Sequence, residues 1–301
     1  MLPAFDARGA CLARYHRRML PISVVMAARN SEQTIVSAAV SILEQDHPVF
    51  ELIVVDDAST DRTPHILVTH PALAAVKVIT LNERVGRSAA RNKAIAQARY
   101  DAIAIMDSDD FALPHRLRAA AAILSAQPEI AGVGGQAVGL DKSDLWRFGT
   151  ALTEPNAIAA ALARAQMPLV HPTVVVRKAV FEATGGYRED YVPCEDLDFF
   201  RRASSRFRFA GTDDVWLLYR KPPRYTWVDL WRTEINRARL ERADNFPRHP
   251  YRVRTIAYDV SAAGHCARQW LSQHRHPVDR VDHPPGGVLD RALQRCLELD
   301  Q

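Results

Sequence analysis

Short apolar runs alternate with amphipathic segments over the first third of the chain. Four of these runs end abruptly in polar residues, which predicts buried strands at residues 22–27, 52–55, 76–81 and 102–106. Between them, the spacing of apolar residues and the capping signals predict helices at about 31–44, shortly after Asp61, and at 87–99. Strands that alternate with helices indicate a parallel sheet covered on both faces.

The pattern is less regular further along the chain. It predicts helices over 114–126, near 156–165 and from Glu195, and strands over 130–138 and 172–176. From Pro222 the composition shifts toward Arg, aromatic and His residues, and helices are expected over 227–246 and from about 255 and 288. We therefore expect a basic leader (1–20), an α/β domain (21–221) and a helical C-terminal tail (222–301).

Composition narrows the class of protein. The chain has 301 residues, 48% of them hydrophobic, and a formal net charge of +4, which suits anionic ligands or an anionic membrane surface but is too small to indicate nucleic acid. No apolar run approaches the ~20 residues that span a bilayer. Four widely separated cysteines predict reduced thiols, namely Cys11, Cys194, Cys266 and Cys296. We expect a cytoplasmic protein whose membrane contact, if present, is peripheral.

The strongest chemical signal is a group of acids after the strand at 102–106. Asp107, Asp109 and Asp110 flank or follow Ser108, so their negative charges repel one another unless a cation lies among them. Oxygen ligands of this kind suit Mg²⁺ or Mn²⁺. His171 is a further candidate ligand, although a lone histidine is more often structural, and the acids themselves are also common in turns.

Other strand ends carry candidate nucleotide-binding residues, because ligands collect at the carboxyl ends of parallel strands. The candidates in the first two loops are Ala27, Ala28, Arg29, Asn30, Asp56 and Asp57, where either acid can instead cap its own turn. Arg87 and Arg91 open the helix at 87–99, whose N-terminus favours anions. Surface exposure is an equally good explanation for Arg87.

Glu195-Asp196 is the candidate catalytic pair. A carboxylate at this position can act as the general base that deprotonates an acceptor hydroxyl. The alternative is that these acids only stabilise the N-terminus of a helix. The pattern alone does not say which of the two is the base.

Taken in order, the motifs resemble those of family 2 glycosyltransferases, over roughly residues 20–220. The stretches that carry the resemblance are Pro21–Met26, Val54–Asp61, Gly86 through Asn92, Met106–Asp110, Gly185-Gly186-Tyr187 and Glu195-Asp196. The resemblance implies a GT-A fold, which is a Rossmann-like, mostly parallel sheet sandwiched by helices, here with a helical C-terminal extension. It divides the domain into a nucleotide-binding half (21–113) and an acceptor-binding half (114–221).

The implied activity is an inverting, metal-dependent transfer of a sugar from a nucleoside diphosphate, with UDP expected, to a hydroxyl of a glycan or lipid-linked acceptor. Residues 27–30 and Asp57 would hold the nucleoside, and Asp107 and Asp109 the ribose and metal. Asp196, supported by Glu195, would be the base. The Gln-x-x-Arg-Trp pattern of processive synthases is absent from the sequence, which favours a single addition.

Two other classes of function remain open at this stage. One is a non-catalytic module that binds nucleotide sugars, and the other, less favoured, is a phosphohydrolase that uses strand-end aspartates. The tail helix carries apolar residues among arginines, including Trp231, Ile235 and Leu240. This helix is expected to pack on the catalytic domain or a second subunit, with contact to an anionic membrane as the alternative.

Overall fold

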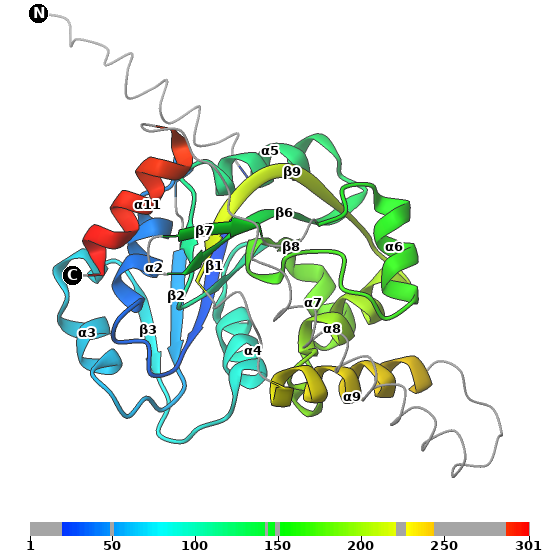
Figure 1. Ribbon diagram of the computed structural model, residues 1–301, viewed down its shortest axis with the longest axis horizontal. Coiled ribbons are helices and arrows are strands. Elements are labelled where there is room, and N and C mark those ends of the chain that lie inside the picture. Colours follow the sequence, from blue (N-terminus) through cyan, green and yellow to red (C-terminus); the bar gives the residue numbers. More distant parts are fainter. Residues whose placement is uncertain are drawn as a thin grey trace, which may run out of the picture.

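A single curved sheet forms the centre of the molecule (Figure 1). The computed structural model describes residues 20–48, 51–141, 144–147, 151–220, 227–243 and 287–300. Within them the strand order is β3-β2-β1-β4-β8-β6-β9-β5, and β7 pairs with β6. The strands are β1 (Ile22–Ala28), β2 (Glu51–Asp56), β3 (Lys77–Thr80), β4 (Ala102–Asp107), β5 (Phe111–Ala112), β6 (Ile130–Asp141), β7 (Asp144–Arg147), β8 (Val175–Arg177) and β9 (Arg208–Tyr219).

Helices cover both faces of this sheet. They are α2 (Ile35–Leu43), α3 (Thr63–Thr69), α4 (Arg87–Gln97), α5 (Arg116–Ala126), α6 (Pro155–Ala163), α7 (Lys178–Thr184), α8 (Glu195–Ser204), α9 (Trp227–Ala243) and α11 (Val288–Leu299). Figure 1 shows α2, α3 and α11 at one end of the molecule and α6 to α9 at the other, with α4 between them.

The nucleotide-binding half has the predicted parallel pairing. Strands β3, β2, β1 and β4 are parallel to one another. Their side chains alternate between two cores: Val24 and Met26 of β1 pack with α2, whereas Val25 packs with α4. Both faces are buried, which explains why these strands read as continuous apolar runs.

The second half departs from the predicted pattern. Strand β8 is antiparallel to both β4 and β6, and among the described strands of this half β6 and β9 are the parallel pair. The sequence pattern missed β9 because its centre carries the exposed acids Asp213 and Asp214 and its pairing with β6 is interrupted by register shifts. The strand predicted at 172–176 is a 3₁₀ turn (His171–Thr173) followed by β8, since Pro172 has no N–H for a ladder bond.

Both described tail helices pack on the catalytic domain, and for α9 this is one of the two packing arrangements that the sequence predicted. Leu240 of α9 is buried in the core beside α8, and α11 buries Leu293 and Cys296. The face of α9 that packs differs from the predicted apolar stripe, because Glu234 and Asn236 are buried while Ile235 is 37% exposed. The helix predicted from about 255 and residues 1–19 of the predicted leader lie outside the described residues.

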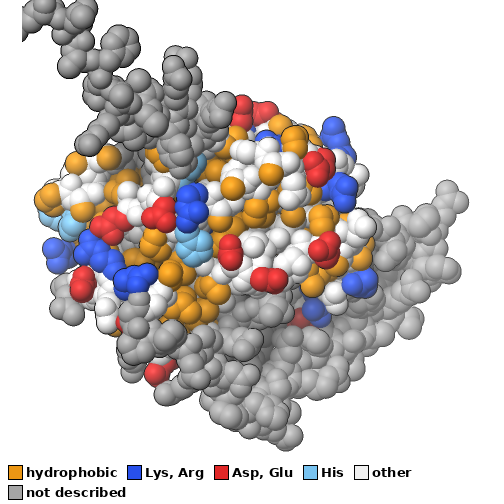
Figure 2. Space-filling model, turned by 90° about the horizontal axis from the view of Figure 1, so that it is seen from above, with side chains coloured by type: hydrophobic (Ala, Val, Ile, Leu, Met, Phe, Trp, Pro, Cys, Tyr) orange, Lys and Arg blue, Asp and Glu red, His pale blue; other side chains and the backbone are white. Residues whose placement is uncertain are grey.

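Among the described cysteines, Cys194 and Cys296 are free thiols, as expected, while Cys11 and Cys266 lie outside this part of the chain. None of the helices within the described ranges combines the length and the apolar character needed to cross a membrane. On the described part of the face shown in Figure 2, basic and acidic side chains are mixed among hydrophobic ones. This mixture agrees with the small net charge of +4.

Candidate active site

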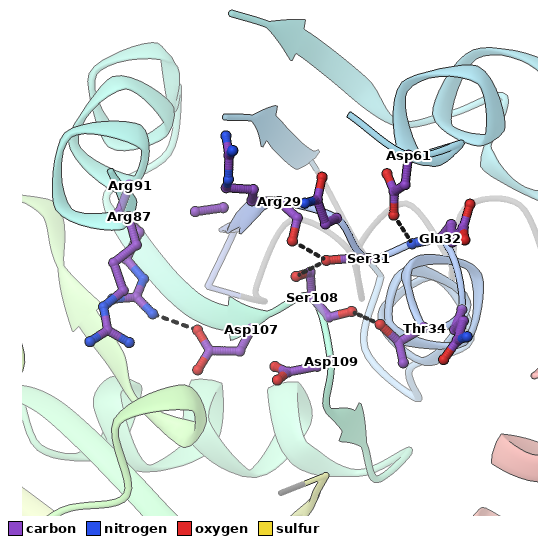
Figure 3. A pocket seen from close by; sticks show the side chains of 13 residues that line it. Arg29, Ser31, Glu32, Thr34, Asp61, Arg87, Arg91, Asp107, Ser108 and Asp109 are labelled. Atoms are coloured by element: carbon purple, nitrogen blue, oxygen red, sulfur yellow. Dashed lines mark hydrogen bonds and ion pairs between the residues drawn. The ribbon is translucent and has the colours of Figure 1, made fainter. Parts of the chain in front are cut away.

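The acids that follow β4 lie together at the carboxyl end of the sheet. Ligand atoms of Asp107, Asp109 and Asp110 lie within 4.8 Å of one another. Asp107 and Asp109 line a cavity of about 590 Å³, which is also lined by the loop after β1 and the start of α4 (Figure 3). Clustered carboxylate oxygens beside such a cavity are a donor set that suits Mg²⁺ or Mn²⁺.

Asp110 lies behind this cavity and has other contacts. It is fully buried, and its Oδ1 accepts the backbone N–H of Arg220 at 2.8 Å. The guanidinium of Arg116, also fully buried, donates to the carbonyl of Ile105 at 2.6 Å. Burial lowers the pKa of Arg116 to about 10, although the charges of Asp110 and Asp107 oppose the shift. Arg116 therefore places a positive charge behind the acids.

Hydrogen bonds join the loop of acids to the loop after β1. The hydroxyls of Ser108 and Ser31 lie 2.8 Å apart, and Thr34 Oγ1 donates to the Ser108 carbonyl at 2.8 Å (Figure 3). Ala27, Arg29, Asn30 and Ser108 all line the cavity. Ala28, by contrast, is buried within the core.

The acids after β2 mainly organise the backbone. Asp56 accepts the hydroxyl of Ser59 in its own turn, and neither Asp56 nor Asp57 lines the cavity. The two carboxylate oxygens of Asp57 accept N–H groups of Val85 and Gly86 at 2.6 and 2.9 Å. Asp57 thus holds the loop that leads into α4, where Gly86 adopts a φ of +88°.

Two backbone carbonyls of the loop after β2 hold the side chain of Arg29. The Nη1 of Arg29 donates to the carbonyls of Asp57 and Ala58 at 2.7 and 2.9 Å, so the guanidinium is fixed at the edge of the cavity. The side-chain amide oxygen of Asn30 accepts the N–H of Thr60 at 2.9 Å. These bonds bring the ends of β1 and β2 together.

Arg91 connects the acids after β4 with the Glu195-Asp196 pair. Its Nη2 lies 2.6 Å from Asp107 Oδ1, and its Nη1 lies 2.8 Å from Glu195 Oε1. Burial alone would lower the pKa of Arg91, but the carboxylates of Asp107 and Glu195 outweigh burial and raise it. The half-exposed Arg87 also pairs with Glu195 Oε1, at 2.8 Å. Glu195 is therefore neutralised by two arginines.

Asp196 has a different environment, although it is the next residue. It lies in the first turn of α8, after Cys194, whose φ of +97° is strained for a residue with a side chain. Burial and the negative charge of Glu195 raise the pKa of Asp196 to about 6. A carboxylate with a pKa near neutrality is suited to accept and release a proton.

His171 lies beside Tyr187. The Nε2 of His171 is 2.9 Å from the Tyr187 hydroxyl. In the described part of the chain, the group of side chains that could hold a metal ion does not include His171. Burial raises the pKa of Tyr187, so this hydroxyl stays protonated. The sequence made His171 a candidate metal ligand, and this contact instead fits the alternative of a structural role.

The Gly185-Gly186-Tyr187 turn is fixed to α4 by a residue that the candidate site did not include. The Asn92 side chain donates to the Tyr187 carbonyl at 2.8 Å and accepts the Tyr187 N–H at 2.9 Å. A Cβ on Gly186 would lie 2.5 Å from Asn92 Oδ1 and would displace that side chain, and the φ of +74° also favours glycine at this position. The sequence signal that could have identified Asn92 as a site residue was its place at the end of the motif from Gly86 to Asn92.

The fold and the site define a glycosyltransferase of the GT-A class. The sequence profile described as "Glycosyl transferase family 2" matches residues 23–184, which is more than half of the chain. The chain therefore belongs to glycosyltransferase family 2, as its motifs predicted.

Three known proteins illustrate the similarity. The succinoglycan biosynthesis protein ExoO of Rhizobium meliloti is 43% identical over 97 residues, which cover 32% of this chain and only 28% of ExoO. TarS of S. aureus, solved with UDP-GlcNAc, has a TM-score of 0.56 at 20% identity and covers 84% of this chain and 72% of its own. The mannosyltransferase PcManGT of Pyrobaculum calidifontis, solved with GDP-Man and Mn²⁺, has a TM-score of 0.56 at 20% identity and covers 97% and 94%. At these identities the two structures support the fold.

Proposed function

We propose that this chain is an inverting glycosyltransferase that moves a sugar from a nucleoside diphosphate to an acceptor hydroxyl. One observation carries the proposal: Arg91 joins the cavity-lining Asp107 to Glu195, which immediately precedes an acid of raised pKa, Asp196. One network thus joins the proposed donor-binding cavity to the residue next to the candidate base. A phosphohydrolase does not need the second acidic pair.

A divalent metal, Mn²⁺ or Mg²⁺, is part of the proposal. Asp107 and Asp109 would hold it, because their oxygens are hard donors, lie close together and line the cavity. Bound there, the metal offsets the charge of the departing diphosphate. PcManGT, which shares the fold, was solved with Mn²⁺ and supports this part of the proposal.

The chain's own residues would perform the transfer as follows. Above a pH of about 6, the Asp196 carboxylate takes the proton of the acceptor hydroxyl. The acceptor oxygen forms a bond to the anomeric carbon while the bond from that carbon to the diphosphate breaks on the opposite face, which inverts the configuration. Arg87, at the edge of the cavity, adds positive charge near the leaving group.

Uridine is the proposed base, since TarS was solved with UDP and with UDP-GlcNAc. The proposed acceptor is a glycan or a lipid-linked glycan of the cell envelope, extended by one sugar, and the relation to ExoO, a succinoglycan biosynthesis protein, supports this class. A cytoplasmic location and a peripheral membrane contact of the tail stay predictions. Salt-sensitive binding to anionic vesicles would test the membrane contact.

Calorimetric titration tests the proposal directly. We expect UDP to bind the purified chain more tightly than GDP, with a dependence on Mn²⁺ that Asp109→Ala abolishes. Asp213→Ala is the matched control, because Asp213 is an exposed acid in the middle of β9. Preference for GDP would reassign the donor base. Failure to bind any nucleotide, with or without Mn²⁺, would overturn the proposed function.

A further inference from the structure

Helix α11 lies outside the part of the chain that matches the family, yet it packs on the strand that follows the acids. The match ends at residue 184, whereas α11 spans Val288–Leu299. Ala292, Leu293 and Cys296 of α11 form a core cluster with Phe111, the residue directly after Asp110. In Figure 1, α11 lies beside α2, where Arg295 pairs with Glu44 at 2.6 Å.

Arg220, which follows β9, joins this helix to Asp110. Its backbone N–H donates to Asp110 Oδ1 at 2.8 Å. Its guanidinium pairs with Asp300 Oδ2 at 2.9 Å, just after the end of α11, and also contacts Cys296 Sγ. The side chains of Arg220 and Asp300 are 17% and 26% exposed, so the pair is partly shielded from solvent. A third contact, to Ser37 Oγ at 3.4 Å, directs the guanidinium toward α2.

Asp110 in turn belongs to the tight turn that carries the cavity-lining acids. Its N–H points to the carbonyl of Asp107 at 3.4 Å, and the carboxylate oxygens of the three acids lie within 4.8 Å. A displacement of Asp110 therefore moves Asp107 and Asp109. Substitution of residues that hold metal ligands in place, without contacting the metal themselves, commonly changes metal affinity strongly.

We propose that Arg220 is a positioning residue for the metal-binding acids and that α11, through Asp300, sets their geometry. The C-terminal helix is then a component of the donor site that the family's shared region does not contain. This inference rests on the proposed function, because it requires that the acids bind a divalent metal.

The test measures Mn²⁺ binding to the full chain in the presence of UDP, by loss of the electron paramagnetic resonance signal of free Mn²⁺. We expect Arg220→Ala to weaken Mn²⁺ binding about tenfold, and Asp300→Asn to weaken it by a smaller factor. Arg220→Lys retains a cation that can reach Asp300 and should restore part of the affinity. Arg295→Ala is the matched control, since it removes another ion pair that holds α11 on the domain without a contact to Asp110.

Binding of UDP without metal is measured in parallel and should stay unchanged in every variant, whereas a general loss of structure would weaken it. If Arg220→Ala does not yield folded protein, Asp300→Asn carries the test, since it keeps Arg220. Wild-type Mn²⁺ affinity in both variants would overturn the inference alone. Equal weakening in Arg295→Ala would also overturn it. If the wild-type chain itself binds no Mn²⁺, the metal part of the proposed function fails, and the inference with it.

Discussion

Two adjacent acids, Glu195 and Asp196, differ because of their neighbours. Glu195 is bound by Arg87 and Arg91, each at 2.8 Å, so its charge is balanced. Asp196 is partly buried and lies beside the negative Glu195, which together raise its pKa to about 6. Since a general base works best when its pKa is near the operating pH, Asp196 is the better candidate.

The first prediction concerns Asp196→Asn. An amide cannot accept the proton, so we expect the transfer rate to fall by about 10² to 10⁴, with UDP affinity unchanged. In the wild-type chain, Asp196 becomes protonated as the pH falls through about 6, so the rate should decline below that pH. Steady-state kinetics from about pH 5 to about pH 8, on both sides of the pKa of about 6, checks both. A variant that keeps more than a tenth of the rate, or an exposed control such as Glu189→Gln that loses as much, would contradict this role.

At the scale of elements, α9 fixes the segment that enters α8. The side-chain amide of Asn236 donates to the Pro193 carbonyl at 2.8 Å, and Cys194 Sγ donates to the Thr233 carbonyl at 3.6 Å. Burial, together with the nearby negative charges, raises the pKa of the Cys194 thiol to about 12, which makes this thiol unreactive. The strained backbone of Cys194 is thus held by the helix that packs over it.

The second prediction concerns Asn236→Ala. The Pro193 carbonyl loses its donor, which should lower the free energy of unfolding by about 1–3 kcal/mol and let the segment open. Urea denaturation measures the first effect, and mass spectrometry of Cys194 after treatment with a thiol reagent measures the second. Arg232→Ala, an exposed position on the same helix, should change neither quantity. If Cys194 reacts no faster in Asn236→Ala, α9 does not hold the segment.

At the scale of the whole molecule, the described end of the tail completes the catalytic domain. The cluster that joins α11 to the sheet includes Leu293, Phe111, Val138 and Leu218, which come from four elements or connections far apart in sequence. A core shared in this way predicts that the domain and α11 unfold together rather than as separate units.

The third prediction follows from this shared core. Leu293→Ala leaves a cavity at a residue that is 6% exposed and should lower the free energy of unfolding by about 2–5 kcal/mol, in a single transition. Val288→Ala is the control on the same helix, because Val288 is 45% exposed and should change stability by less than about 0.5 kcal/mol. Calorimetry, or urea denaturation followed by two probes, distinguishes a single unfolding transition from separate unfolding of α11. A separate early transition in Leu293→Ala would show that α11 is an independent appendage.

The sequence by itself determined the parallel half of the sheet, the order of its motifs and the position of the acids at a strand end. These features are local: β-branched runs buried on both faces are recognisable within six residues, and a polar residue after such a run must lie at the edge of the sheet. The same reasoning located Asp107 and Asp109, whereas the Glu195-Asp196 pair was recognised at the start of a predicted helix and by its resemblance to the family motif. The sequence pattern could not decide which acid of that pair is the general base.

Only the tertiary structure decided what each charged group contacts. Arg91 reaches Glu195 across 104 residues of sequence, and Arg220 reaches Asp110 across 110. It also showed that Asp57 binds the backbone of the loop before α4, and that α11 packs behind the acids. The physical reason is that the pKa of a carboxylate, and its role, depend on burial and on neighbouring charges, which are set by packing between distant segments and leave no periodic trace in the chain.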